Sequence, residues 1–324
     1  MGLSANLNPS FNRGSPDLVK ISTGERKILV FGANGQVGYE LVAKARGGAT
    51  GFDHATVDIS DPAEVAHAIR EYPPAALVNA AAYTSVDRAE AEQDNAFRVN
   101  RDGAAILAQA AAEAGVPFIH LSTDFVFDGT KRTPYREDDP VAPLGAYGLS
   151  KAEGEAAVRA LCPQHVILRT AWVYSPYGNN FVRTMLRLAA NHPELRIVDD
   201  QTDCPTAAAD IALTILAILS LADRPGFMEW GTYHYRGADI VSWHGFATII
   251  FEMAAAYGQR ASNVVPIKTA EYPTPAHRPG YSVLATDKLE ATFGIFPRPL
   301  RASLDECLRA LFRRRVDKQV GGVS

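Results

Sequence analysis

Residues 27–38, KILVFGANGQVG, join a short apolar run to three glycines at Gly32, Gly35 and Gly38. Four consecutive apolar residues after Lys27 are typical of a strand buried on both faces of a parallel sheet. In such a stretch Gly32 permits a tight turn, Gly35 lets backbone N–H groups approach a pyrophosphate at a helix N-terminus, and Gly38 lets helix and strand pack closely. The spacing is G-x-x-G-x-x-G and not the commoner G-x-G-x-x-G, so a plain turn is the alternative. The strand–loop–helix context favours nucleotide binding.

Apolar runs and helix-like segments alternate downstream of this unit, which predicts a doubly wound, Rossmann-type α/β fold with a parallel sheet. Beyond residue 180 the helices are separated by proline-rich connections, and we expect a smaller, partly helical C-terminal lobe there. The expected strands are 27–31, 75–79, 116–121 and 165–169, and the expected helices are 62–70, 97–114, 146–161, 181–190, 207–221, 242–257 and 300–312.

These patterns divide the chain into four parts. Residues 1–26, rich in Asn, Ser, Pro and Gly and without an apolar signal segment, are expected to be a flexible tail. Residues 27–180 are predicted to be the NAD(P)-binding Rossmann domain. Residues 181–312 are predicted to be mainly a substrate-binding lobe that can return strands to the sheet, and residues 313–324 a second tail.

The composition excludes several classes of protein. The chain has 324 residues, of which 47% are hydrophobic and 21% charged, so it can bury a sizeable core. Its 32 basic and 36 acidic residues give a net charge of −4, which provides no global field to attract nucleic acid. No window approaches the roughly 18 apolar residues of a membrane span, and three scattered cysteines fit a reducing compartment. We therefore expect a cytoplasmic protein without nucleic-acid or membrane partners.

Acidic residues follow the glycine loop at the distance where an adenosine ribose is bound. Asp53 is the candidate, because such a carboxylate lies about 20 residues beyond the fingerprint. A carboxylate there favours NAD over NADP, since it repels a ribose phosphate. Asp58, followed by Ile59, is placed either to reach the adenine or to serve as a turn residue. No arginine stands beside Asp53, so the preference between NADH and NADPH stays open.

Tyr147 and Lys151 are four residues apart and therefore share one face of a predicted helix. A nearby cation favours phenolate, so we expect Lys151 to lower the pKa of Tyr147 toward that of an acid/base catalyst. An exposed helical pair is the alternative. Thr123 follows a predicted strand, at the edge where parallel sheets present side chains to ligands. The glycine loop, a hydroxyl, a tyrosine and a lysine together form the constellation of a short-chain dehydrogenase/reductase.

Residues 27–312 resemble one branch of the extended short-chain dehydrogenases/reductases, the dTDP-4-dehydrorhamnose reductase family. The segments most particular to that branch are V-D-x-A-E, D-D-Q-x-x-x-P-T and Y-P-T-P-A-x-R-P, at 86–90, 199–206 and 272–279. Further matching segments are STDFVFDG at 122–129, YGLSKAEGE at 147–155, LRTAWVY at 168–174, GNNFVRTML at 178–186 and GTYHYRGADIVSW at 231–243.

The resemblance implies reduction of the 4-keto group of dTDP-6-deoxy-L-lyxo-4-hexulose by NADPH or NADH, which gives dTDP-L-rhamnose. It assigns Tyr147 as proton donor, Lys151 as the group that holds the nicotinamide ribose, and Thr123 as a residue that tunes Tyr147 and binds the keto oxygen. The implied cofactor contacts are Gly32, Gly35, Gln36, Val37, Gly38, Asp53, Asp58, Ile59, Ala81, Ala82, Tyr83 and Thr84, and the implied substrate contacts are Thr123, Asp124, Trp172, Gln201 and Arg278.

Two departures from the family pattern leave the exact substrate open. Phe125 stands where tyrosine is frequent, and Cys204 where a small residue is usual. The family also implies Mg²⁺ and a homodimer as expectations, but its motifs place no metal ligand in this sequence. The alternatives are a reductase of another nucleotide-linked 4-ketosugar and a non-catalytic NADP-binding regulatory subunit, such as that of methionine adenosyltransferase.

Overall fold

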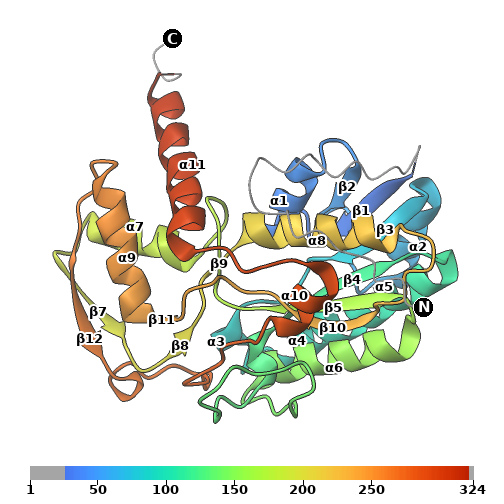
Figure 1. The fold of residues 1–324 in the computed structure, drawn as a ribbon, viewed down its shortest axis with the longest axis horizontal. Coiled ribbons are helices and arrows are strands. Elements are labelled where there is room, and N and C mark those ends of the chain that lie inside the picture. The colour runs from blue at the N-terminus through green and yellow to red at the C-terminus, as the bar shows by residue number, and fades with distance from the viewer. Residues whose placement is uncertain (1–25, 321–324) are drawn as a thin grey trace, which may run out of the picture.

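The computed structural model describes residues 26–320, with side chains described as far as residue 313. Its centre is a sheet of six parallel strands in the order β10-β5-β4-β3-β1-β2 (Figure 1). The chain order reverses between β1 and β3, which is where a doubly wound sheet opens a ligand crevice. The prediction of a doubly wound parallel α/β fold is confirmed. The strands are β1 (Lys27–Phe31), β2 (Ala49–Phe52), β3 (Pro74–Asn79), β4 (Phe118–Thr123), β5 (His165–Thr170) and β10 (Gly231–His234).

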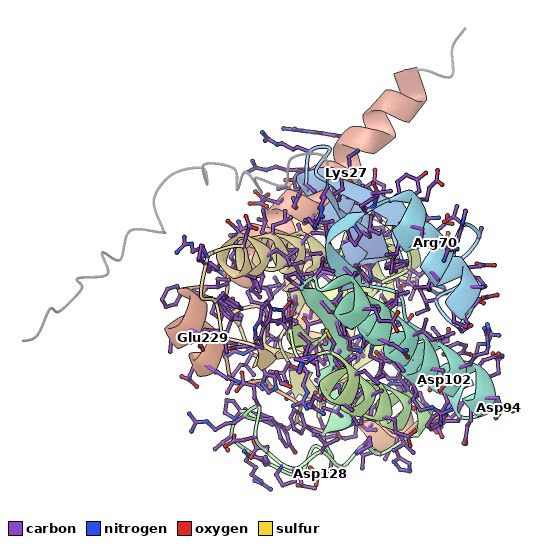
Figure 2. All side chains as sticks on the ribbon, turned by 90° about the vertical axis from the view of Figure 1, so that its right-hand side faces the viewer. Lys27, Arg70, Asp94, Asp102, Asp128 and Glu229 are labelled. Carbon is purple, nitrogen blue, oxygen red and sulfur yellow. The ribbon has the colours of Figure 1, made fainter. Side chains whose placement is uncertain are left out.

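Helices cover both faces of this sheet, and alternate residues of each strand enter opposite cores. Ile28 and Val30 of β1 pack toward α1 and α8, whereas Leu29 and Phe31 pack toward α2, α5 and α6. Figure 2 looks onto the right-hand side of Figure 1, where the charged side chains of Arg70 and Asp94 lie on the surface. These helices are α1 (Gln36–Lys44), α2 (Pro62–Glu71), α5 (Gly103–Ala114), α6 (Ala146–Leu161) and α8 (Ala208–Ala222).

A second core lies beside the carboxyl edge of the sheet. It is built around Phe246 and Ile250 of α9, against α7, α11 and the pair β7–β12 (Figure 1). The chain crosses between the two parts more than once, because α8 and β10 return to the central sheet from beyond residue 180. Helix α10 (Asp287–Phe293) packs on the central sheet through Leu289. The elements outside the sheet layers are α7 (Phe181–Ala189), β7 (Glu194–Val198), α9 (Trp243–Ala255), β12 (Asn263–Ile267) and α11 (Leu300–Val320), with the short strands β6 (Val173–Tyr174), β8 (Thr202–Asp203), β9 (Thr206–Ala207) and β11 (Val241–Ser242).

Some element boundaries differ from the sequence expectation. The strand β2 has the sequence ATGF, which is too short and too small to stand out, and it was not predicted. The helix expected at 97–114 is three elements, α4 (Gln93–Phe97), a π-helical segment (Arg98–Asp102) and α5. Helix α11 continues to Val320, past the expected start of a C-terminal tail at residue 313. The N-terminal tail, 1–26, lies outside the described residues except for residue 26.

Candidate active site

The glycine loop brings the backbone of β1, α1 and the segment after β3 into close contact. Gly32 has φ +87°, and a Cβ there would lie 2.4 Å from the backbone nitrogen of Ala81. A Cβ on Gly38 would lie 2.2 Å from the carbonyl oxygen of Gly32. No side chain caps α1, and its first turn carries no acidic residue, so the N–H groups there face a site open to an anion. The cradle therefore fits a pyrophosphate.

A cleft of about 770 Å³ opens at the carboxyl ends of the parallel strands, from the glycine loop to Tyr147 and Lys151. It thus unites the predicted nucleotide site with the predicted catalytic pair. Of the predicted residues, the cleft is lined by Gly32, Gly35, Gln36, Val37, Asp53, Asp58, Ile59, Ala81, Ala82, Tyr83, Thr84, Tyr147 and Lys151, whereas Gly38, Thr123, Asp124, Trp172, Gln201 and Arg278 are not among its lining residues.

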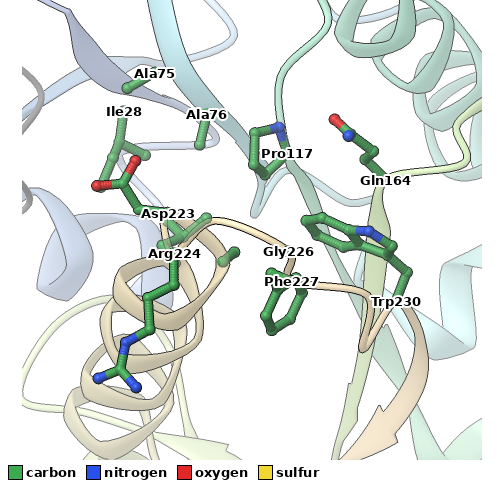
Figure 3. Close-up of a pocket in the computed structure, with 12 residues that line it drawn as sticks. Ile28, Ala75, Ala76, Pro117, Gln164, Asp223, Arg224, Gly226, Phe227 and Trp230 are labelled. Carbon is green, nitrogen blue, oxygen red and sulfur yellow. The ribbon is translucent and has the colours of Figure 1, made fainter.

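A second cavity, of about 280 Å³, lies at the opposite edge of the sheet (Figure 3). Ile28, Ala75 and Pro117, which lie at or near the starts of their strands, line it together with Phe227 and Trp230. Ligands of open α/β sheets bind beyond the carboxyl ends of the strands. None of the predicted site residues lines this cavity, so we assign the chemistry to the larger cleft.

The adenosine end of the cleft contains a cation that sequence reasoning missed. The Asp53 carboxylate accepts hydrogen bonds from Asn34 and from the Thr56 hydroxyl, and the Thr56 bond lowers its pKa. Arg98, in the π-helical segment, lines the same cleft and donates to Asp58 at 3.1 Å. The two residues are 40 positions apart, so no local motif signals their pairing.

A buried amide holds the segment after β3 in place. Asn100 is 1% exposed; its oxygen accepts from the Tyr83 backbone nitrogen at 2.8 Å, and its nitrogen donates to the Tyr83 carbonyl at 3.1 Å. The same nitrogen is 3.0 Å from the hydroxyl oxygen of Ser150, to which it donates. The tyrosine hydroxyl in turn donates to Glu92 at 2.8 Å. Asn100 thus ties the wall of the cleft at Tyr83 to the helix that carries Tyr147 and Lys151.

Lys151 is buried at the base of the cleft, with 2% of its surface exposed. Its Nζ donates to the carbonyl oxygen of Leu121 at 2.7 Å and lies 3.4 Å from Nε2 of His120. Burial lowers the pKa of Lys151 to about 8, against the opposing effect of the Glu155 carboxylate. A cation that is held in place and partly desolvated is suited to bind hydroxyl groups of a ribose.

Tyr147 lines the cleft one helical turn before Lys151, and Thr123 lies within hydrogen-bond reach of it. Burial raises the pKa of Tyr147 to about 12; the Thr123 bond opposes this shift and the Asp124 charge adds to it. The expectation that the pKa of Tyr147 is lowered is therefore wrong, because burial is the largest effect on it and Lys151 is not among its causes. Phe125, which replaces a frequent tyrosine, packs its ring edge-on against Tyr147 at a centroid distance of 5.6 Å.

The V-D-x-A-E segment positions helix α6, which carries Tyr147 and Lys151. The Glu90 carboxylate accepts a hydrogen bond from the Ala146 backbone nitrogen at 2.9 Å and so caps α6 from 56 residues away. Acidic groups at a helix N-terminus satisfy free N–H groups and match the helix dipole. Gly148 allows the same helix to approach the carbonyl oxygen of Phe125, since a Cβ would lie 2.2 Å from that atom. Sequence spacing indicated neither contact.

Two of the predicted substrate residues, Asp124 and Arg278, do not line the cleft and are hydrogen-bonded to other side chains of the protein. Asp124 is 2% exposed and accepts from the Thr123 hydroxyl at 3.0 Å. Arg278 forms a two-bond ion pair with Asp87, at 2.8 and 3.0 Å, so its guanidinium already has a carboxylate partner.

An aromatic stack lies on the lobe side of the site. Trp172 has φ +44°, a strained value for a residue other than glycine, and its ring stacks on Trp243 at a centroid distance of 3.4 Å. The Gln201 amide is 6% exposed; it accepts from the Trp243 indole at 3.2 Å and donates to Thr269 at 3.1 Å. Gln201 therefore supports the stack in this structure.

Residues 26–320 contain no grouping of three or more His, Cys, Asp or Glu side chains that is suited to a metal ion. Within the same residues, no helix has both the length and the apolar content needed to cross a bilayer. Cys162, Cys204 and Cys307 are buried free thiols. The structure thus adds no metal centre to the cleft.

Comparison with known proteins identifies the relatives of this chain. Residues 26–313 match the family described as the RmlD substrate binding domain. The dTDP-4-dehydrorhamnose reductase of Sinorhizobium fredii is 47% identical over 273 residues, which are 83% of this chain and 92% of that protein. The crystal structure of a dTDP-4-dehydrorhamnose reductase from Clostridium acetobutylicum has a TM-score of 0.82 and 39% identity, and covers 88% of this chain and 99% of its own.

A second solved structure, of dTDP-4-dehydrorhamnose reductase from Bacillus anthracis in complex with NADP, has a TM-score of 0.79 and 34% identity. It covers 90% of this chain and 99% of its own. The matches therefore extend over the Rossmann part and the C-terminal lobe together. On this evidence the chain belongs to the dTDP-4-dehydrorhamnose reductase family.

Proposed function

We propose that this chain reduces the 4-keto group of dTDP-6-deoxy-L-lyxo-4-hexulose to give dTDP-L-rhamnose, the last step of dTDP-rhamnose synthesis. The observation that carries the proposal is the joining of the glycine loop, Tyr147 and Lys151 in one cleft of about 770 Å³. The family membership supports the choice of substrate. An intact tyrosine and lysine at this cleft favour an enzyme over a non-catalytic regulatory subunit of the same fold.

The cleft fits a nicotinamide dinucleotide. The close approach of backbone at Gly32 and Gly38 leaves room for a pyrophosphate against the N-terminus of α1, and the bound cofactor would supply the hydride. Arg98 at the adenosine end supports acceptance of a ribose phosphate, since a guanidinium pairs well with phosphate. We therefore propose NADPH as a cofactor, with NADH as the competing one. The NADP complex of the Bacillus anthracis relative agrees with this proposal.

Tyr147 is the proton donor in this proposal. With a pKa of about 12 its phenol is protonated at neutral pH, so it can donate to the oxygen that gains negative charge when hydride reaches C4. Thr123 lies beside the phenol and helps to orient it. Lys151, held by the Leu121 carbonyl, would hold the ribose of the cofactor near the tyrosine.

The first test is oxidation of NADPH and of NADH by the purified protein with this ketosugar nucleotide, with and without Mg²⁺. We expect dTDP-L-rhamnose as product. The Tyr147→Phe variant should lower kcat by about 10²–10⁴-fold, the usual contribution of a general acid, and leave cofactor binding nearly unchanged. Tyr72→Phe, at an exposed tyrosine that caps the C-terminus of α2 and is not part of the cleft lining, is the matched control.

Cofactor binding without oxidation would contradict the rhamnose assignment. In that case, other nucleotide-linked 4-ketosugars are the next substrates to try, and failure with these would favour the regulatory-subunit alternative. Sedimentation of the same preparation tests the family expectation of a homodimer, and chelation of Mg²⁺ tests the expected metal requirement.

A further inference from the structure

The side chain of Gln36 is hydrogen-bonded to the segment that leads from the sheet into the C-terminal lobe. Gln36 is the first residue of α1, in the glycine loop. Its Oε1 accepts from the amide nitrogen of Asn180 at 2.9 Å and from the hydroxyl of Ser175 at 3.0 Å. Its Nε2 donates to the carbonyl oxygen of Val173 through a longer bond of 3.4 Å. The partners lie 137 to 144 positions further along the chain, so this contact depends on the tertiary fold.

The orientation of the two amides follows from the helix that Asn180 caps. The Asn180 oxygen accepts from the Arg183 backbone nitrogen at 3.2 Å, at the N-terminus of α7, so the nitrogen of this amide is the atom that faces Gln36. An amide nitrogen only donates, and Gln36 must therefore turn its oxygen to Asn180 and its nitrogen to Val173. Both polar atoms of the Gln36 side chain thus have partners within the protein.

The partners of this glutamine are the chain neighbours of the aromatic stack on the lobe side of the site. Val173 directly follows Trp172, and Asn180 directly precedes Phe181. The ring of Phe181 packs on that of Trp243, the first residue of α9, at a centroid distance of 4.6 Å. Trp243 in turn stacks on Trp172 at 3.4 Å. One amide therefore holds both the strand that follows the first tryptophan and the start of α7, which lies beside α9 (Figure 1).

The loop between β6 and α7 is also part of the cleft wall. Gly178 and Asn179 line the cleft together with Gln36. Gly178 has φ +62°, and a Cβ there would lie 3.4 Å from Cγ of Gln36, so the loop packs closely on the glutamine stem. The glycine loop and the lobe therefore meet at this wall.

We propose that Gln36 is a positioning residue for the sugar: its backbone belongs to the cofactor cradle, while its side chain sets the place of the Trp172–Trp243 stack relative to that cradle. Trp172 is one of the residues expected to contact the deoxysugar, so the amide acts on sugar binding through the stack. This inference rests on the proposed function, because it assigns a role in binding the ketosugar nucleotide.

Replacing Gln36 by methionine separates this role from a side-chain contact with the cofactor. Methionine has a similar length and removes all three hydrogen bonds, while the backbone N–H groups of α1 stay in place. We expect the KM for the ketosugar nucleotide to rise about tenfold or more and NADPH affinity to stay within about threefold of wild type. A side chain that binds the cofactor would give the opposite result. Gln109→Met, at an exposed glutamine of α5 that is bonded to Glu113, is the matched control.

A substitution on the lobe side tests the same contact from its other end. Asn180→Ser keeps a good N-cap for α7, but serine is too short to reach Gln36. We expect the same rise in KM for the ketosugar nucleotide with NADPH affinity nearly unchanged. Because both substitutions remove one shared bond, the double variant should lose no more than the weaker-binding single variant. Losses that add fully would contradict the proposed link.

Circular dichroism of the stacked indoles tests the role of Gln36 without any turnover. Two stacked indoles couple their electronic transitions, and we expect the coupled band of wild type to weaken in Gln36→Met and to persist in Gln109→Met. The proposal is overturned if Gln36→Met loses as much affinity for NADPH as for the ketosugar nucleotide, or if the indole band and this KM are both unchanged. If Gln36→Met does not fold, Asn180→Ser decides. If wild type does not reduce the ketosugar, the proposed function fails, while the indole band and NADPH titration still report on Gln36.

Discussion

Replacing Gly38 by alanine should damage the cofactor cradle although the same change strengthens most helices. Gly38 is the third residue of α1, and an added Cβ would lie 2.2 Å from the carbonyl oxygen of Gly32 and 2.9 Å from Cα of Ala33. All of these atoms belong to backbone, so no side chain can rotate away. The helix must therefore move away from β1, and the N–H groups that face the pyrophosphate move with it.

The magnitude follows from two opposing effects. Alanine is favoured over glycine in a helix interior by about 1 kcal/mol. Inserting a methyl group into a well-packed site costs about 1–3 kcal/mol, and here two backbone segments must separate. The difference is about 0–2 kcal/mol, and because two backbone segments must separate we expect a net destabilisation in its upper half, about 1–2 kcal/mol. We also expect at least a tenfold loss of NADPH affinity, which corresponds to about 1.4 kcal/mol.

Gly245→Ala provides the matched control. Gly245 is also the third residue of its helix, α9, and its added Cβ would make ordinary contacts at 3.4 Å with the Ser242 hydroxyl and 3.6 Å with Val241. Thermal unfolding and NADPH titration of both variants measure the two effects. We expect Gly245→Ala to be as stable as wild type or more so, with unchanged NADPH affinity. If Gly38→Ala unfolds and binds NADPH as the control does, the close-contact reasoning is refuted.

Three other predictions concern side chains around the site. Glu90→Ala removes the cap of α6, so we expect unfolding free energy to fall by about 0.5–2 kcal/mol and kcat to fall with it; unchanged values in urea unfolding and turnover assays would contradict the capping role. Arg98→Ala should raise the KM for NADPH about tenfold and leave the KM for NADH nearly unchanged in steady-state kinetics. Arg101→Ala is the control, because Arg101 is not part of the cleft lining. Burial acts to raise the pKa of Glu155, but bonds from Arg169 outweigh it and hold that pKa below its ordinary value of 4.5. The ion pair therefore stabilises the fold fully above pH 4.5, and this stabilisation is lost as the pH falls through the lowered pKa of Glu155. In unfolding measurements across pH, Glu155→Gln should abolish this part of the pH dependence of the unfolding free energy.

Local patterns predicted part of the cleft, and the family resemblance predicted more of it. The glycine loop and Asp53 line the cleft because each follows directly after a parallel strand and such strand ends meet at one edge of the sheet. Ala81 and Ala82, which also line it, were implied by the resemblance. The pKa of Tyr147 was predicted in the wrong direction. The prediction that this pKa is lowered came from the four-residue spacing of Tyr147 and Lys151. Burial, which depends on the whole fold, instead raises the pKa of Tyr147 to about 12.

The amino-acid sequence by itself determined the first βα unit, the alternation of strands and helices, and the Tyr147–Lys151 pair. These features depend on backbone freedom at glycine, on hydrophobic periodicity and on the pitch of a helix, all of which act within a few residues. Only the tertiary structure decided which distant groups meet: Glu90 caps α6 across 56 residues, Arg278 pairs with Asp87 across 191, and Ser282 donates to Asp203 across 79. The physical reason is that packing of helices and loops on the sheet sets these contacts, and the local periodicity of a chain does not record its partners in packing.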